Sequence, residues 1–131
     1  MALEKNLRIH HVYTDEHGES HFKDIEISYE SVHFGGADHR AKPIPVTSMI
    51  FRKTSADQDL DFHNAPQRQF CINLDAGVEV TVSDGETRYV GRGEVLLLED
   101  VTGKGHMSRH IEKKLRHSVF ITLPQAGWEA A

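Results

Sequence analysis

The segment VEVTVSDGETRYV, residues 78–90, joins two alternating runs of β-forming residues through Asp84-Gly85. An Asp-Gly pair between such runs is a strong hairpin signal, because glycine tolerates the positive φ that tight hairpin turns need. A second tight reversal at Gly91-Arg92-Gly93 leads into the apolar run within residues 94–99. The sequence therefore predicts three consecutive antiparallel strands.

Shorter runs of the same kind lie on both sides of this unit. They predict strands at residues 8–14, 22–27, 47–53, 70–74, 107–111 and 118–123. No window shows the sustained i, i+3, i+4, i+7 apolar spacing of a long amphipathic helix. Short strands at close spacing favour a sandwich, jelly roll or barrel over an alternating α/β fold. We therefore predict an all-β fold with few or no helices.

Length and composition are those of one soluble domain. The chain has 131 residues, of which 38% are hydrophobic and 27% charged. Its longest apolar run, residues 95–98, is too short to span a bilayer, and residues 1–8 lack the features of a secretory signal. The single cysteine, Cys71, cannot form an internal disulfide. These features predict a cytoplasmic protein with no membrane partner.

The charges are mixed along the chain. The formal net charge is -5, and the 15 Lys and Arg residues form no extended basic block, so nucleic acid is not an expected partner. The short basic stretch at residues 113–116 is interpreted as a solvated surface or loop. Ten histidines are scattered through the sequence, which is unusual for this length and directs attention to a histidine-containing site.

Two segments place polar side chains together. Residues 59–65 alternate between polar and apolar, so as a strand they put Asp61 and His63 on one face. After a turn, residues 69–74 alternate again, and the polar face of this segment consists of Gln69, Cys71 and Asn73. We therefore predict an interior site in which Asp61, Gln69, Cys71 and Asn73 contact a ligand.

These segments carry a family resemblance, because residues 47–123 resemble a cupin domain. Cupins are small double-sheet β-barrels, so the resemblance implies a double-stranded β-helix, or jelly-roll barrel. We expect residues 1–131 to form a single cupin-like domain. The strands within residues 8–27 are then added to the barrel or to a dimer interface.

The first cupin motif contains two histidines and a glutamate that typically bind a metal inside the barrel. His63 falls on the first histidine, Ala65 on the second and Gln69 on the glutamate. In the second motif Gly93 matches the opening glycine, and a loop that is two residues longer than the family pattern precedes His106. The resemblance thus makes His106 the counterpart of the last metal-binding histidine and implies a site at His63, Gln69 and His106.

Two kinds of chemistry follow from these positions. A divalent transition metal needs three or more ligands. Of the family positions only His63 and His106 keep a strong ligand, and Asp61, Glu99, Asp100 or His110 are candidate substitutes. Without a metal, His63 and His106 can act as general acid and base, because imidazole titrates near neutral pH.

The leading interpretation is a protein that binds a small polar or anionic metabolite, with isomerase, epimerase or other enzymatic activity at His63 and His106. Lys104 and Arg68 are candidates for contact with an anionic ligand. One alternative is a non-catalytic binding or sensory module, and another is a metal-dependent oxygenase or isomerase with substitute ligands. A homodimer is expected, because a small barrel leaves edge strands and apolar area to cover.

Overall fold

The computed structural model describes residues 6–31 and 38–129, and these residues form twelve β-strands and no helix. The larger sheet contains, in spatial order, β2 (Ser20–Glu26), β1 (Arg8–Thr14), β10 (Val95–Leu98), β7 (Gln69–Asn73), β12 (Arg116–Thr122) and β5 (Ser48–Thr54). The smaller sheet contains β6 (Leu60–His63), β11 (His106–Arg109), β8 (Val78–Val82) and β9 (Thr87–Val90). The short strands β3 (Glu30–Ser31) and β4 (His39–Arg40) pair separately. The all-β prediction is confirmed.

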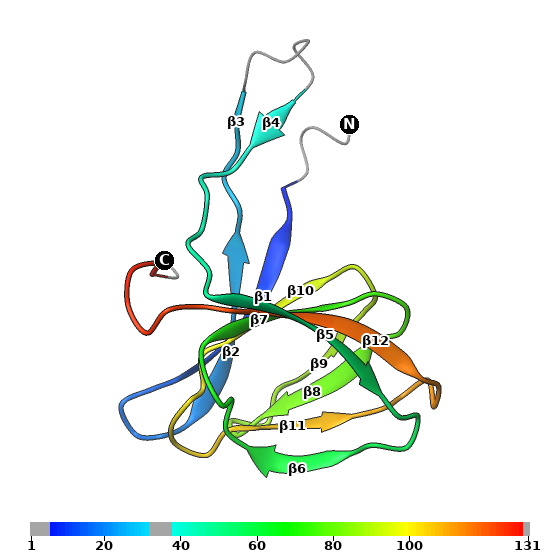
Figure 1. The fold of residues 1–131 in the computed structure, drawn as a ribbon. Coiled ribbons are helices and arrows are strands. Elements are labelled where there is room, and N and C mark those ends of the chain that lie inside the picture. The colour runs from blue at the N-terminus through cyan, green and yellow to red at the C-terminus, as the bar shows by residue number, and fades with distance from the viewer. Residues whose placement is uncertain (1–5, 32–37, 130–131) are drawn as a thin grey trace.

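The two large sheets face each other, and the β3–β4 pair projects from the body (Figure 1). From β5 onward the chain passes repeatedly between the sheets, and only β8 and β9 are successive strands of the same sheet. Strands that are distant in sequence therefore face a common interior. Within the described ranges no helix is long and apolar enough to cross a membrane.

The central hairpin forms as predicted, but its third strand does not follow it. β8 pairs with β9 from Val78 opposite Val90, and Gly85 has a φ of 103°. β10 lies instead in the larger sheet, parallel to β1 and antiparallel to β7. The prediction of three consecutive antiparallel strands is therefore wrong. A continuous apolar run needs cover on both faces, and an inner strand of the larger sheet provides it.

The N-terminal strands extend the larger sheet. β1 pairs with β10, and β2 pairs with the other side of β1 along its whole length. Residues 8–27 thus continue the sheet beyond β10.

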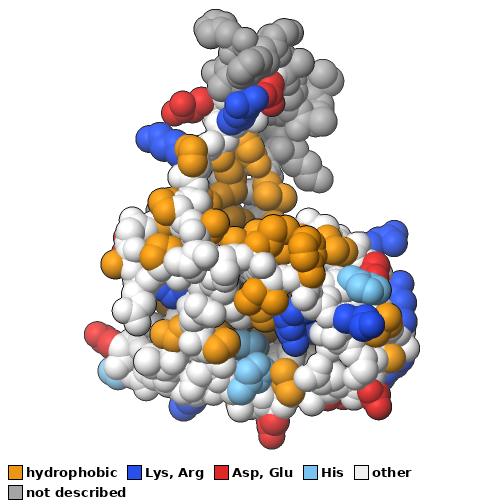
Figure 2. Space-filling view, viewed as in Figure 1, with side chains coloured by type: hydrophobic (Ala, Val, Ile, Leu, Met, Phe, Trp, Pro, Cys, Tyr) orange, Lys and Arg blue, Asp and Glu red, His pale blue; other side chains and the backbone are white. Residues whose placement is uncertain are grey.

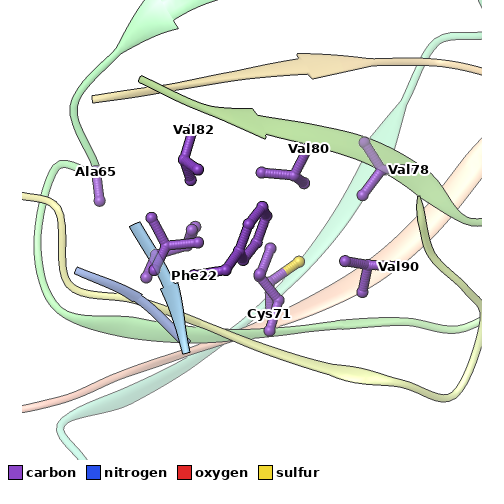
Figure 3. Close-up of a cluster of buried hydrophobic side chains, with 10 residues drawn as sticks. Phe22, Ala65, Cys71, Val78, Val80, Val82 and Val90 are labelled. Atoms are coloured by element: carbon purple, nitrogen blue, oxygen red, sulfur yellow. The ribbon is translucent and has the colours of Figure 1, made fainter. Parts of the chain in front are cut away.

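The main apolar core lies between the two sheets. Val80 and Val82 of β8 point from the smaller sheet toward Phe22 and Cys71 of the larger sheet (Figure 3). A second cluster contains Phe70 and Leu97 on the opposite face of the larger sheet, where Trp128 packs with its ring centroid 5.7 Å from that of Phe70. Burying a side chain of this size contributes roughly 1.5–3 kcal/mol.

A partly exposed ionic cluster links the β1–β2 turn to the β8–β9 turn. His21 lies 2.6 Å from a carboxylate oxygen of Asp15 and 2.8 Å from one of Asp84. The hydrogen bond to Asp15, followed by that to Asp84, raises the pKa of His21 above 6.5. The hydrogen bond from His21 in turn lowers the pKa of Asp15 from 3.8 to about 2.

We expect His21→Gln to lower the free energy of unfolding most between pH 3.8 and pH 6.5. The raised His21 pKa contributes stability below the unfolded value, and this contribution is lost as pH rises through the folded value. The lowered Asp15 pKa contributes stability above its unfolded value, and this is lost as pH falls toward about 2. Urea unfolding across this range measures the effect, with the exposed His17→Gln as control. A difference between wild type and His21→Gln that grows in alkaline solution contradicts it.

The homodimer stays a prediction, and β5 is where we expect it to form. β5 is an edge strand, and its side chains Met49 and Phe51 are 58% and 75% exposed. Edge strands with exposed apolar side chains are sites of pairing with another chain. We expect a sedimentation mass of two chains for the wild type and of one chain for Phe51→Glu, whereas Val101→Glu leaves the dimer intact. A wild-type mass of one chain at micromolar concentration contradicts the prediction.

Candidate functional site

A cavity of about 240 Å³ lies between the two sheets. Its walls come from β5, β6, β7, β8, β10, β11 and β12, together with the chain on either side of β6. Figure 2 shows histidine and basic side chains beside a hollow on this face of the molecule. The volume is slightly below the range of about 300–1,000 Å³ that is typical of small-molecule sites.

The two predicted catalytic histidines lie together in this cavity. His63 ends β6, His106 begins β11, and the two residues are direct partners in the smaller sheet. Their ring centroids are 4.5 Å apart, with the planes tilted by 55°. His106 is buried and His63 is partly exposed. The structure therefore brings these two residues into one site, as predicted.

Each imidazole is held through its Nδ1 nitrogen. The Nδ1 of His106 lies 2.6 Å from Oδ2 of Asp100, a fully buried carboxylate. The Nδ1 of His63 lies 2.8 Å from the backbone carbonyl oxygen of Asp61. A carbonyl or carboxylate oxygen can only accept, so in both rings Nδ1 is the donor. Each neutral ring then keeps the lone pair on Nε2, where it can accept a proton.

Three of the predicted ligand-binding residues line the cavity from β7. Gln69, Cys71 and Asn73 are all buried and occupy alternate positions of this strand. Burial raises the pKa of the Cys71 thiol to about 11. The thiol therefore stays protonated at neutral pH and is a small apolar wall residue, not a nucleophile.

Asp61 does not share the face of His63, and this part of the prediction is wrong. The pairing of β11 with β6 joins His106 to His63 but Ser108 to Leu60, so β6 contains one extra residue between the two pairs. Such a bulge interrupts the alternation of side chains. As a result Leu60 and His63 line the cavity, and Asp61 is exposed.

Arg68 and Lys104 also lie outside the cavity walls. The Nε of Arg68 donates to Glu99 at 2.6 Å, and its other nitrogens donate to the backbone oxygens of Pro124 and Trp128. The bonds to Pro124 and Trp128 hold the C-terminal segment against the body. The charge of Arg68 is paired with Glu99. The Nζ of Lys104 lies 3.0 Å from Glu19 on the surface. The structure does not support either residue as a contact for a ligand in this cavity.

Two arginines that the sequence interpretation misses do line the cavity. Arg52 of β5 and Arg116 of β12 both face it, and Arg116 is only 9% exposed. Burial lowers the pKa of the Arg116 guanidinium from its ordinary value. The interpretation of residues 113–116 as a solvated surface is wrong for Arg116. The alternation of Arg116, Ser118 and Phe120 along β12 is the signal that places it on the inner face.

His110 is buried beside this site without lining it. Its backbone N–H donates to Asp59 at 2.9 Å, and both ring nitrogens lack a hydrogen-bond partner. Burial, followed by the charge of Arg116, lowers the pKa of His110 below 6.5. The lowered pKa favours the neutral form of His110, which is buried outside the cavity lining.

The donor atoms around the two histidines do not fit a transition metal. No group of three His, Cys, Asp or Glu side chains in residues 6–31 and 38–129 could hold such an ion. Ala65 has no donor atom, and Gln69 offers a neutral amide where a carboxylate would bring charge. Moreover, the guanidinium groups of Arg52 and Arg116 line the same cavity and repel a cation.

The candidate substitute ligands do not complete a metal site either. Asp100 is bonded to His106, and Glu99 is bonded to Arg68. Asp61 is exposed, as described above, and His110 does not line the cavity. Neither the set His63, Gln69 and His106 nor these substitutes supplies the anionic ligand that the site would need.

Comparisons with known proteins give no assignment. No family model matches the chain, and no curated protein matches it. Among solved structures, protein NMB1881 from Neisseria meningitidis is similar with a TM-score of 0.46 and 15% identity, over 74% of this chain and 84% of that one. The conserved protein SPY1581 of unknown function from Streptococcus pyogenes has a TM-score of 0.43 and 17% identity, over 64% of this chain and 82% of that one. Likenesses at this level define neither a family nor a function.

Proposed function

We propose that the chain is a cupin-like jelly-roll protein that binds a small polar or anionic metabolite and transfers a proton on it with His63 and His106. The observation that carries this proposal is the imidazole pair in the cavity, with ring centroids 4.5 Å apart and His106 bonded to the buried Asp100. The chemistry is that of an isomerase or epimerase.

The strand order supports the jelly-roll part of the proposal. Strands β5 to β12 contribute four strands to each sheet, in the orders β10-β7-β12-β5 and β6-β11-β8-β9. A jelly roll has eight strands in two such sheets. In this arrangement β6 and β11 lie next to each other, and they carry His63 and His106.

The proposed reaction needs one neutral and one protonated imidazole. The neutral ring accepts a proton at Nε2 from a carbon next to a carbonyl group, and the protonated ring donates its Nε2 proton to the carbon or oxygen that receives it. The substrate loses one proton and gains one, so no oxidant, reductant or metal is consumed. Positioned acid and base groups typically contribute about 10²–10⁴-fold to the rate.

Solvent isotope exchange tests the proposal even while the substrate is unidentified. A panel of 2-oxo acids, 2-hydroxy acids, aldoses and ketoses is incubated with the protein in D2O, and loss of the exchangeable C–H signal is followed by proton NMR. We expect exchange with at least one compound class, lost in His63→Gln and His106→Gln and kept in the exposed His17→Gln. Compounds that bind without exchange favour the non-catalytic module. If no compound in the panel binds or undergoes exchange, the result contradicts the proposal. The cytoplasmic location stays a prediction.

A further inference from the structure

The two ends of the cavity differ in chemistry. Gln69 pairs with Leu98 on β10, two residues before the Asp100 that holds His106, so it marks the histidine end. Asn73 pairs with Ser118 at the other end of β7. Gln69 and Asn73 are four residue steps apart along the strand, which corresponds to about 13 Å. A ligand that contacts both ends must be elongated.

The end marked by Asn73 is cationic. On β12, Arg116 lies two residues before Ser118. Its partner on β5 is Thr54, and the partner of Ser118 is Arg52. The guanidinium carbon of Arg52 lies 4.4 Å from the ring centroid of Phe120, which fixes it against the wall. Two positive charges therefore line this part of the cavity and influence each other electrostatically, and the described walls contain no carboxylate.

Among the described residues, no carboxylate forms an ion pair with Arg116 at this end. Its Nε and Nη1 atoms are buried and have no hydrogen-bond partner, and the buried Oγ1 of Thr54 has none either. Asp75 attracts Arg116 at longer range, but its carboxylate is bonded to the backbone N–H and Nδ1 of His117. A buried charge is costly unless it is paired and hydrogen-bonded. An anionic ligand group would supply the missing partner.

The middle of the cavity is mostly apolar, although Ser108 of β11 also lines it beside Val80 and Leu60. Its walls there are Leu96, Cys71 and Phe120 on the larger sheet and Val80 and Leu60 on the smaller one. These side chains offer few polar partners for the central part of a ligand. An apolar body of the ligand therefore fits between the cationic end and the histidines.

We propose that Arg116 and Arg52 bind the carboxylate of an elongated ligand whose apolar body lies along Phe120 and Leu96. The carboxylate matches the planar fork of a guanidinium, with which it forms two parallel hydrogen bonds. Phosphate sites commonly use free backbone N–H groups of loops or helix N-termini, whereas this end consists of strand side chains. That the far end of the ligand meets His63 and His106 rests on the function proposed above.

Hexanoate and 1-hexanol are suitable probes, because they differ only in the anionic group. Binding to the full chain labelled with ¹⁵N is followed by NMR through the Nε–H signal of Arg116 and the backbone signals of β12. We expect hexanoate to bind about tenfold or more tightly than 1-hexanol, and Arg116→Gln to abolish this difference. The exposed Arg92→Gln is the matched control and keeps it. Hexanoate that binds no more tightly than 1-hexanol, or equally to Arg116→Gln, overturns the proposal.

Two further arms keep the test decisive. Arg52→Gln retains Arg116 and is expected to weaken hexanoate several-fold, so the proposal remains testable if Arg116→Gln fails to fold; an unchanged affinity overturns it. Hexyl phosphate that binds more tightly than hexanoate overturns the assignment to a carboxylate. Hexanoate has no polar group for the histidines, so its affinity is expected to survive His63→Gln. Failure of the proton-transfer proposal is thereby distinguished from failure of this one.

Discussion

Gly105→Ala is expected to lower the free energy of unfolding by roughly 3 kcal/mol or more, because the new methyl group meets backbone atoms. Gly105 has a φ of 77°, and an added Cβ would lie 2.2 Å from the carbonyl oxygen of His63 and 2.5 Å from its carbonyl carbon. The left-handed conformation alone costs an alanine about 1–2 kcal/mol. The overlap with His63 adds to this cost, since β6 must move away from β11. Urea unfolding followed by the fluorescence of Trp128 measures the change.

Gly93→Ala is a close control for this prediction. Gly93 has a φ of 79°, and an added Cβ would meet nothing within 4 Å. The decrease in the free energy of unfolding of Gly93→Ala should therefore be limited to the conformational cost of about 1–2 kcal/mol. Equal losses in the two variants would show that the approach of Gly105 to His63 is not tight. In Gly105→Ala we also expect proton-transfer activity to disappear, because the two histidines separate.

Turn chemistry is local, and this explains which part of the β8–β10 unit could be predicted. Asp84-Gly85 specifies a tight hairpin, and the hairpin is found. The turn at Gly91–Gly93 specifies a change of direction, but not the sheet that the chain enters. β10 pairs with β1 and β7, which are more than 20 residues away in the sequence, and such pairings are set by burial of both faces of the strand.

The sequence predicts which histidines lie in the candidate site, but it does not place the charged residues around them correctly. Alternation alone places Gln69, Cys71 and Asn73 correctly, because β7 is regular. The same pattern misplaces Asp61, because a single bulged residue reverses the faces of a strand. The sequence of this segment contains no residue that predicts the bulge.

Arg116 escapes prediction for a different physical reason. It ends a run of basic residues, and charged side chains are rarely buried without a partner. Its burial therefore runs against the average behaviour of arginine. Burial of an unpaired charge lowers the stability of a fold, and such exceptions are expected at functional sites.

Asp100→Asn is expected to reduce the proposed proton-transfer rate by about 10²–10⁴-fold while leaving ligand binding nearly intact. In the wild type the carboxylate accepts from Nδ1 of His106 at 2.6 Å and so keeps the Nε2 lone pair available. An asparagine amide in the same place can donate to Nδ1 instead. The imidazole proton then moves to Nε2, which can no longer act as the base.

The tautomer of His106 distinguishes this positioning role from a loss of structure. The ¹⁵N chemical shifts of the two ring nitrogens are expected to exchange in Asp100→Asn, with the fold retained. Asp61→Asn is the matched control, because Asp61 contacts His63 only through its backbone oxygen, which the substitution leaves in place. If Asp100→Asn keeps the wild-type tautomer and rate, the buried carboxylate does not orient His106. The acid–base assignment would then rest on the contact between the two imidazoles alone.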